Sequence, residues 1–231
     1  MIPLKDTTRR RSIPFVTLLL IAVNIAVFVY QIMLSSPATN IFINTYALVP
    51  SKIPLALAGR HYTLEQAIVP LFTCMFLHGG FLHILGNMWF LWIFGGNVED
   101  RLGSFTYLIF YLICGIGSSV SQLLFSWGSH VPSLGASGAI SGVLGAYVVL
   151  FPGSRILTLV PLFIIWFTAR IPAVIFIGVW FLVQFLSGIG RLGAPGSVNA
   201  GGVAWWAHVG GFLLGMFLAQ GSRRQPAASY G

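Results

Sequence analysis

Charged residues are scarce in this sequence. They make up 7% of its 231 residues and hydrophobic residues make up 57%, whereas an ordinary soluble domain is roughly 25% charged. So few charges cannot cover a water-facing surface, which excludes a soluble enzyme, a soluble nucleic-acid-binding protein and a disordered chain. The composition leaves a polytopic membrane protein.

Acidic residues and cysteines are the rarest of the reactive types. The acids are Asp6, Glu65, Glu99 and Asp100. Paired carboxylates or a hard-metal site have almost no material here, so no metal site is expected. Cys74 and Cys114 lie inside apolar runs without metal or redox spacing, and we expect small buried residues rather than a disulfide. The net charge of +8 does not predict a nucleic-acid partner, because the bases form no stripe.

Apolar runs predict six membrane-spanning helices, since a span needs about 20 apolar residues. The runs are 13–34, 80–98, 104–127, 136–151, 171–189 and 205–221. The first run is too long for a signal peptide and no cleavage pattern follows it. Residues 156–168 are too short to cross and are placed at the interface. The prediction is an all-α membrane protein with a cytoplasmic segment 1–12, a six-helix domain 13–221 and a cytoplasmic tail 222–231.

The basic residues predict the orientation of these spans. With both termini in the cytoplasm, nine of the 12 bases lie inside and three outside. The inner set is Lys5, Arg9, Arg10, Arg11, Arg101, Arg155, Arg170, Arg223 and Arg224, and the outer set is Lys52, Arg60 and Arg191. The second, fourth and sixth spans then all run inward. The short N-terminus lacks a transit-peptide composition, so we expect a prokaryotic plasma (inner) membrane.

Polar side chains at membrane depth mark candidate functional sites. His83 and Asn87 share one face of the second span, Ser137 opens the fourth and His208 lies in the sixth. Counting helical rises from the cytoplasmic end of each span places all four in one layer, about 6–12 Å below the outer boundary. Four polar groups at one level predict a site.

This set of groups suits nucleophilic catalysis. The Ser137 hydroxyl becomes a nucleophile if His208 accepts its proton. Unpaired N–H groups in the first turn, with Asn87 and His83, would stabilise an oxyanion. Small residues on the facing sides of the two helices allow their close approach; they are Gly138, Ser141, Gly142, Gly145, Gly211 and Gly215. No acid lies at this depth, so we predict a Ser-His dyad that hydrolyses peptide bonds.

Four motifs extend this interpretation. They are His78…His83…Asn87, Val98-Glu99-Asp100-Arg101-Leu102-Gly103, Gly135-Ala-Ser137-Gly138 and Ala207-His208-Val-Gly-Gly211. Together, over about residues 65–220, they resemble the rhomboid family of intramembrane serine proteases. The resemblance implies a six-transmembrane-helix rhomboid fold and no cofactor. It also implies transmembrane protein substrates, with a single span that is cut near the outer side of the lipid bilayer.

The resemblance also implies individual roles. Ser137 is the nucleophile and His208 the general base, while His83, Asn87 and the Ser137 backbone N–H form the oxyanion hole. His78 has a supporting role. Glu99 and Arg101 match a cytoplasmic Glu-x-Arg motif, which we interpret as structural.

Two departures and two alternatives stand beside this interpretation. Val69-Pro70 occupies the position of a common Trp-Arg pair, and Ser141 occupies that of an aromatic residue packed on the histidine. We hypothesise that the Ser141 hydroxyl, or a water on it, helps to orient His208.

One alternative is a haem-binding electron-transfer subunit with histidine axial ligands. The other is a proteolytically silent rhomboid-like protein that binds membrane clients.

Overall fold

The fold of this chain, seen in a computed structural model, is mostly helical, and the structure describes residues 1–162, 165–192 and 203–223. The helices before the site are α1 (Phe15–Met33), α2 (Ser36–Tyr46), α3 (Lys52–Leu57), α4 (Leu64–Ile68), α5 (Pro70–Thr73), η1 (Cys74–Phe76), α6 (Phe81–Phe90), η2 (Leu91–Gly95) and α7 (Gly96–Leu102). The others are α8 (Ser104–Phe125), α9 (Ser137–Leu150), α10 (Ala173–Leu192) and α11 (Trp205–Arg223). The strands are β1 (Ile2–Asp6), β2 (Arg155–Leu162) and β3 (Ile165–Pro172).

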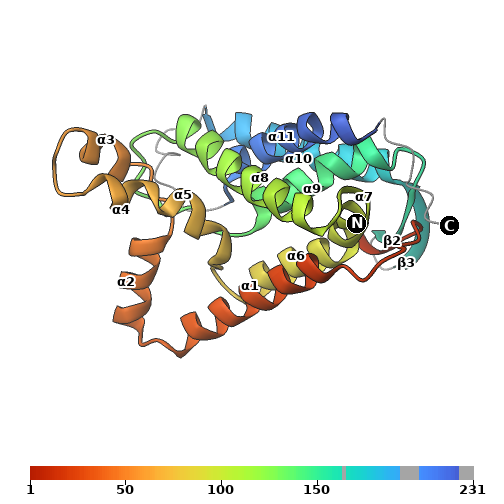
Figure 1. The fold of residues 1–231 in the computed structure, drawn as a ribbon, viewed down its shortest axis with the longest axis horizontal. Helices are drawn as coiled ribbons and strands as arrows, with labels where there is room; N and C mark the ends of the chain where they lie inside the picture. Colours follow the sequence, from red (N-terminus) through yellow and green to blue (C-terminus); the bar gives the residue numbers. More distant parts are fainter. Residues whose placement is uncertain (163–164, 193–202, 224–231) are drawn as a thin grey trace.

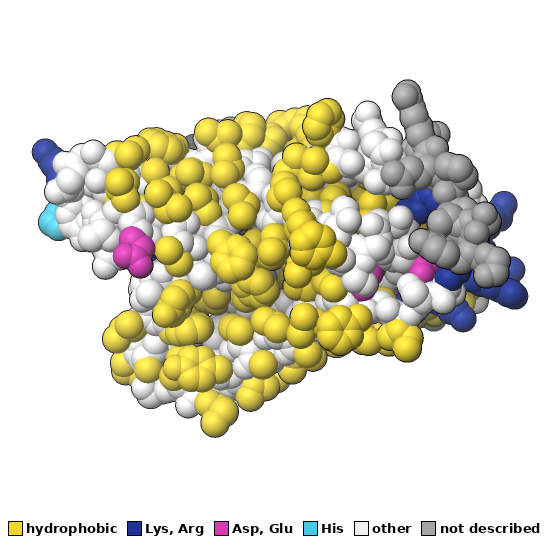
Figure 2. Space-filling view, in the orientation of Figure 1, with side chains coloured by type: hydrophobic (Ala, Val, Ile, Leu, Met, Phe, Trp, Pro, Cys, Tyr) yellow, Lys and Arg dark blue, Asp and Glu magenta, His cyan; other side chains and the backbone are white. Residues whose placement is uncertain are grey.

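The long helices form a bundle, and small elements cover both of its ends. Figure 1 shows α8 to α11 running along the long axis of the molecule, with α2 to α5 at one end and the N-terminus and strands at the other. Hydrophobic side chains cover the middle of the face seen in Figure 2, and Lys and Arg side chains gather mainly at the strand end. A broad apolar band with charges at its ends is typical of a protein embedded in a bilayer.

Four helical stretches are long and apolar enough to cross a membrane among the residues the structure describes: α1, Phe81–Leu102, α8 and α10. These stretches confirm a mostly helical membrane protein. Helix α9 has only 14 residues and is buried throughout from Gly138 to Tyr147. Because neighbouring helices enclose α9, it does not need the apolar surface of a lipid-facing span. The count of six spans stays a prediction.

Helices α9 and α11 lie with their backbones in contact. A Cβ atom added at Gly215 would overlap the backbone of Gly142, and one added at Gly211 would overlap the carbonyl of Gly138. Small residues at matching positions allow this approach, as in other membrane helix pairs. The first turns of α9 and α11 are therefore held side by side.

A three-stranded sheet corrects the expectation of an all-α protein. The segment 156–168, which we expected to lie at the membrane interface, is part of the antiparallel hairpin of β2 and β3. Strand β1, from the predicted segment 1–12, pairs antiparallel with β2. Burial alternates along β2, with Ile156 and Thr158 fully buried and Leu157 between them partly exposed. This period of two is the signature of a strand. In the sequence it is hidden, because the segment reads as a short apolar run.

Glu99 and Arg101, near the strand end, form hydrogen bonds that connect separate helices. Both Glu99 carboxylate oxygens accept hydrogen bonds from the start of α1, at 2.9 Å from the Val16 amide and 2.8 Å from the Thr17 amide. A carboxylate suits a helix N-terminus, where amides lack partners. Arg101 donates to the Ser222 carbonyl at 3.2 Å and so connects α7 with the end of α11. Glu99 and Arg101 thus contact structural elements far from Ser137.

Asp6 anchors β1 to the bundle. Its carboxylate accepts hydrogen bonds from the Tyr147 hydroxyl of α9, at 2.8 Å, and from the Asn97 side chain. Burial raises the pKa of Asp6, although the Tyr147 hydrogen bond opposes this shift. Both Cys74 and Cys114 are buried and free, as expected. Of the predicted tail 222–231, all but the last two residues of α11 lies outside the described residues.

Candidate active site

A serine and a histidine meet where α9 and α11 begin. Ser137 is the first residue of α9 and His208 lies in the first turn of α11. The Ser137 Oγ and the His208 Nε2 are 2.7 Å apart. His208 is only 7% exposed. The close packing of the two helices brings together two side chains that are 71 positions apart in the sequence.

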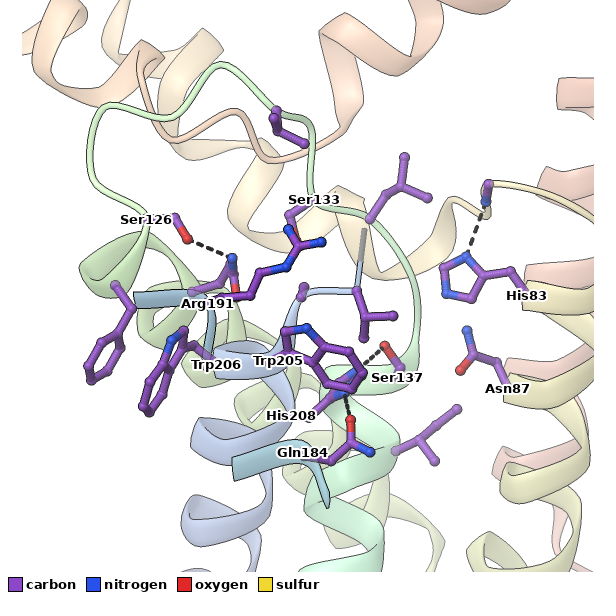
Figure 3. A pocket seen from close by; sticks show the side chains of 18 of the residues that line it. His83, Asn87, Ser126, Ser133, Ser137, Gln184, Arg191, Trp205, Trp206 and His208 are labelled. Carbon is purple, nitrogen blue, oxygen red and sulfur yellow. Dashed lines mark hydrogen bonds between the residues drawn. The ribbon is translucent and has the colours of Figure 1, made fainter. Parts of the chain in front are cut away.

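A glutamine from α10 holds the other side of the histidine ring. The Gln184 Oε1 lies 2.7 Å from the His208 Nδ1, and Gln184 is itself 7% exposed. An amide oxygen only accepts, so Nδ1 carries the ring proton and Nε2 is free to accept one from Ser137. Figure 3 shows Gln184, His208 and Ser137 in one continuous chain of hydrogen bonds.

The structure gives Ser141 a different partner from the one that we hypothesised. Its hydroxyl donates to the carbonyl of Ser137, one turn earlier, at 2.6 Å. Serines inside helices commonly bond to this carbonyl, which satisfies the hydroxyl locally. The hydrogen-bonding partner of the His208 Nδ1 is Gln184, so the structure shows no direct hydrogen bond from Ser141 to His208. A role of Ser141 in orienting His208 stays a hypothesis.

Aromatic rings pack on His208 from outside α9. The Trp180 ring of α10 lies 5.9 Å from the histidine ring at 37°, and the Trp205 ring lies 6.3 Å away at 88°. The aromatic residue absent at position 141 therefore has a spatial substitute on a neighbouring helix.

The sequence did carry a signal for Gln184, since it is a polar side chain inside the apolar run 171–189. Its span runs opposite to those that carry His83, Ser137 and His208, so the depth of Gln184 is not evident from the same count of helical rises. Nothing comparable marks Trp180, because tryptophan is common in membrane helices.

His83 and Asn87 face Ser137 from α6 across the same cavity (Figure 3). The His83 Nδ1 accepts a hydrogen bond from the Gly79 amide at 3.3 Å, so its Nε2 carries the proton. The Asn87 Nδ2 is buried without a hydrogen-bond partner among the described residues. Both side chains thus present donors to the space in front of Ser137.

Gly135 lets the chain pass close to these two donors. Its φ of +126° lies in a region that other residues rarely adopt. A Cβ atom here would lie 2.7 Å from the His83 Nε2 and 3.6 Å from the Asn87 Nδ2. The Gly135 amide donates to the Cys74 carbonyl at 2.9 Å, which fixes the loop. A side chain at position 135 would block the space that a reacting carbonyl needs.

His78 supports the entry to α6 and does not contact Ser137. It is 2% exposed, and its backbone makes two hydrogen bonds with the Gln31 side chain of α1, at 3.1 and 3.2 Å. Its ring lies 5.2 Å from the His83 ring. His78 therefore helps to place His83.

The cavity in front of Ser137 has a volume of about 960 Å³. Its wall includes Ser137, His208, His83, Asn87 and Gln184, together with the loop between α8 and α9. Such a volume admits a peptide segment and water. A nucleophile, a base and convergent donors in one cavity are the parts that acyl transfer requires.

The chain is similar to known proteins of one family. The family model described as Rhomboid domain matches residues 65–225. RHOMBOID-like protein 5 of Arabidopsis thaliana is 36% identical over 171 residues, which are 74% of this chain and 49% of that protein. Rhomboid protein 1, mitochondrial, of Saccharomyces cerevisiae is 32% identical over 145 residues, 61% of this chain and 38% of that protein.

A bacterial relative carries a protease name. Rhomboid protease GluP of Bacillus subtilis is 31% identical over 161 residues, 70% of this chain and 27% of that protein. The chain thus spans about half the length, or less, of these relatives. They include plant and mitochondrial proteins, so the prokaryotic plasma membrane stays a prediction. With its motifs and a matching family model over most of its length, this chain belongs to the rhomboid family.

Proposed function

We propose that this chain is an intramembrane serine endopeptidase that cleaves single-span membrane proteins through Ser137 and His208. One observation carries the proposal. The Ser137 Oγ lies 2.7 Å from the His208 Nε2, at the wall of a cavity that also holds the donors of His83 and Asn87. The similarity to the protease of Bacillus subtilis supports it.

In the proposed reaction, the Ser137 hydroxyl attacks the substrate carbonyl while its proton moves to the His208 Nε2. The oxyanion that forms is stabilised by the Ser137 backbone N–H, the Asn87 Nδ2 and the His83 Nε2. When the C–N bond breaks, His208 returns the proton to the leaving amine. A water molecule then attacks the acyl-enzyme while His208 takes its proton. The ester bond breaks, His208 returns this proton to the Ser137 Oγ, and the carboxylate product is released.

Gln184 replaces the usual acid as the partner of the histidine. Its Oε1 accepts a hydrogen bond from the His208 Nδ1–H throughout the cycle and so keeps the tautomer whose Nε2 accepts from Ser137. A neutral amide stabilises the imidazolium less than a carboxylate does, because it supplies a dipole and not a charge. The proposed machinery is a Ser-His dyad with a neutral positioning residue.

The proposed topology has six spans and cytoplasmic termini. Its support is the distribution of charge, since the exposed residues Lys5, Arg155 and Arg170 all lie on the sheet, at the opposite end of α9 from Ser137. Ser137 then lies toward the outer side, where water reaches the cavity. This placement favours cleavage of transmembrane substrates near the outer surface.

Labelling with a serine-directed fluorophosphonate tests the proposal. The wild-type protein is expected to be labelled and to cleave a single-span reporter, whereas Ser137→Ala loses both activities and His208→Ala loses cleavage. Ser133→Ala is a matched control, because Ser133 lines the same cavity without a histidine partner. Undiminished cleavage by Ser137→Ala would refute the proposal. A folded wild type that neither reacts nor cleaves would favour the client-binding alternative.

The hydrogen bonds of His208 argue against the haem alternative. Both ring nitrogens of His208 make hydrogen bonds, which leaves none for an axial ligand. A Soret band in the purified protein would reverse this judgement.

A further inference from the structure

The hairpin of β2 and β3, between α9 and α10, has no role in the proposed proteolysis. Figure 1 shows β2 and β3 lying across one end of the helix bundle, beside the N-terminus. The hairpin joins the helix that carries Ser137 to the helix that carries Gln184. In the proposed topology, its strands lie where the bundle meets the cytoplasmic surface of the membrane.

The register gives the sheet two different faces. Asp6 pairs with Ile156 and Pro3 with Thr158, and this row of side chains is largely buried against the bundle. On the other face Lys5 pairs with Leu157, which in turn pairs with Arg170. Directly paired residues lie on the same side of a sheet, so the two bases flank Leu157.

Arg155 lies on the same outward face, two residues before Leu157. Lys5, Arg155 and Arg170 are all exposed. The outward face thus combines three cations with an apolar centre.

The start of β3 is exposed on both faces and apolar. Ile165, Trp166 and Phe167 are 65%, 60% and 45% exposed. Successive residues of a strand point to opposite sides, so the described residues cover neither side here. Tryptophan favours the boundary between lipid and water, where its ring is half apolar and its N–H can reach a polar partner. Three uncovered apolar residues in a row need an apolar environment.

The acids at this end do not balance the bases. Three carboxylates lie at this end, those of Asp6, Glu99 and Asp100, and they stay charged although they accept hydrogen bonds within the chain. Six exposed bases outnumber them: Lys5, Arg9, Arg10, Arg11, Arg155 and Arg170. Arg9, Arg10 and Arg11 are exposed and add positive charge beside the sheet. Figure 2 shows the Lys and Arg side chains gathered mainly at this end of the molecule. The field outside the sheet is therefore positive.

We propose that this sheet is a docking surface for the anionic phospholipids of the surrounding bilayer. Residues 165–167 enter the headgroup region, and Lys5, Arg155 and Arg170 contact lipid phosphates. An apolar tip beside a basic face is the combination that binds anionic membrane surfaces. A nucleic acid or an acidic peptide would use the bases but would leave the apolar tip in water.

Fluorescence quenching by brominated lipids tests this contact in the full chain. The protein is reconstituted into phosphatidylcholine–phosphatidylglycerol vesicles in which one lipid or the other carries bromine. The contribution of Trp166 is the difference between the wild type and Trp166→Phe. We expect brominated phosphatidylglycerol to quench Trp166 more strongly than brominated phosphatidylcholine does.

Trp127 provides the matched control, since it is 52% exposed just beyond the other end of α8. The difference between the wild type and Trp127→Phe should show no preference for the anionic lipid. Equal quenching of Trp166 by the two lipids, or no quenching of Trp166, would overturn the proposal.

Removal of the charges tests the role of the basic face. A variant with Lys5→Gln, Arg155→Gln and Arg170→Gln should lose the preference of Trp166 for phosphatidylglycerol, because each base near the surface strengthens the attraction to anionic headgroups about fivefold. Arg170→Gln alone is a milder change that is less prone to cause misfolding. Arg60→Gln, which removes one charge at the opposite end, is the control and should leave the preference unchanged. An unchanged preference in Arg170→Gln and in the triple variant would contradict the proposal. The Ser137→Ala background keeps this test independent of proteolysis.

Discussion

The two helix contacts that build the site differ in kind. Between α9 and α11, glycines bring backbone against backbone, and an added methyl group has no room. Helix α10 instead turns much of its surface outward, and Val174, Ile175 and Leu182 are all more than 40% exposed. Yet α10 supplies Gln184, which orients the histidine. The Ser-His distance thus depends on backbone packing, while the ring orientation depends on one side chain of a loosely enclosed helix.

The largest effect should come from a methyl group in the α9–α11 contact. Gly215→Ala places a Cβ on the backbone of Gly142, so the two helices must move apart. Displacement of catalytic groups by about 1 Å lowers rates by about 10²-fold. We expect kcat/KM for a single-span reporter to fall by at least that factor, measured in detergent or vesicles.

Gly221→Ala is the control on the same helix, because a Cβ there meets nothing within 4 Å. This variant should keep its activity and its unfolding temperature. If Gly215→Ala behaved like Gly221→Ala, the contrast between the tight and the loose helix contacts would be lost.

Replacement of Gln184 tests the α10 side of the comparison. Gln184→Leu removes the acceptor for the His208 Nδ1 proton, and a buried hydrogen bond contributes roughly 0.5–1.5 kcal/mol. We expect kcat to fall about tenfold with little change in KM, since the residue positions the base and does not bind the substrate. Steady-state cleavage of the reporter measures both constants.

Gln184→Glu separates positioning from packing, because it keeps an acceptor of the same length and should retain most of the activity. A loss confined to KM in Gln184→Leu, or equal losses in both variants, would assign Gln184 to packing or substrate binding.

Much of the site could be predicted from the sequence, because catalytic groups at membrane depth are rare and their helical spacing is regular. His83, Asn87, Ser137 and His208 all border the cavity. Gln184 was missed because its span runs the other way, so depth had to be counted from the opposite end. The acceptor of the Ser141 hydroxyl, the Ser137 carbonyl, could not be predicted, because spacing along one helix shows a shared face but not which acceptor is nearer.

The long apolar helices could be predicted, because the length of an apolar run is itself the signal. The strands were harder to predict. The hairpin escaped prediction because residues 156–168 carry a period of two over too few residues to stand out from an apolar run. Its partner β1 is distant in sequence, and pairings such as Asp6 with Ile156 have no local signal.

Asp6, at the strand end of α9, tests how a half-buried charge affects the stability of the fold. Asp6→Asn can keep the acceptor for Tyr147 and Asn97, which both bond to one carboxylate oxygen, but removes a half-buried charge. Because burial raises the pKa of Asp6, the folded wild type binds a proton more tightly than the unfolded chain does. The wild type therefore loses stability as the pH rises from the ordinary Asp value through this raised pKa, and the variant does not.

The unfolding temperature of Asp6→Asn should thus exceed that of the wild type by a few degrees near neutral pH, and the gap should close in acid. A thiol-reactive dye can follow unfolding, since both cysteines are buried. A gap that is the same at all pH values, or that widens in acid, would contradict the role of the buried charge.

The smallest effect is expected at Ser141, inside the tightly packed helix. Its hydroxyl bonds to the Ser137 carbonyl, which α9 already offers to its own backbone, so Ser141→Ala removes a redundant contact. We expect kcat to fall less than about threefold, with an unchanged pH profile, because a hydrogen bond of this local kind contributes under 1 kcal/mol. A tenfold loss with a shifted pH profile would mean that Ser141 acts on His208 during turnover. In that case the orientation of the base would depend on α9 as well as on α10, and the division between the two helix contacts would no longer hold.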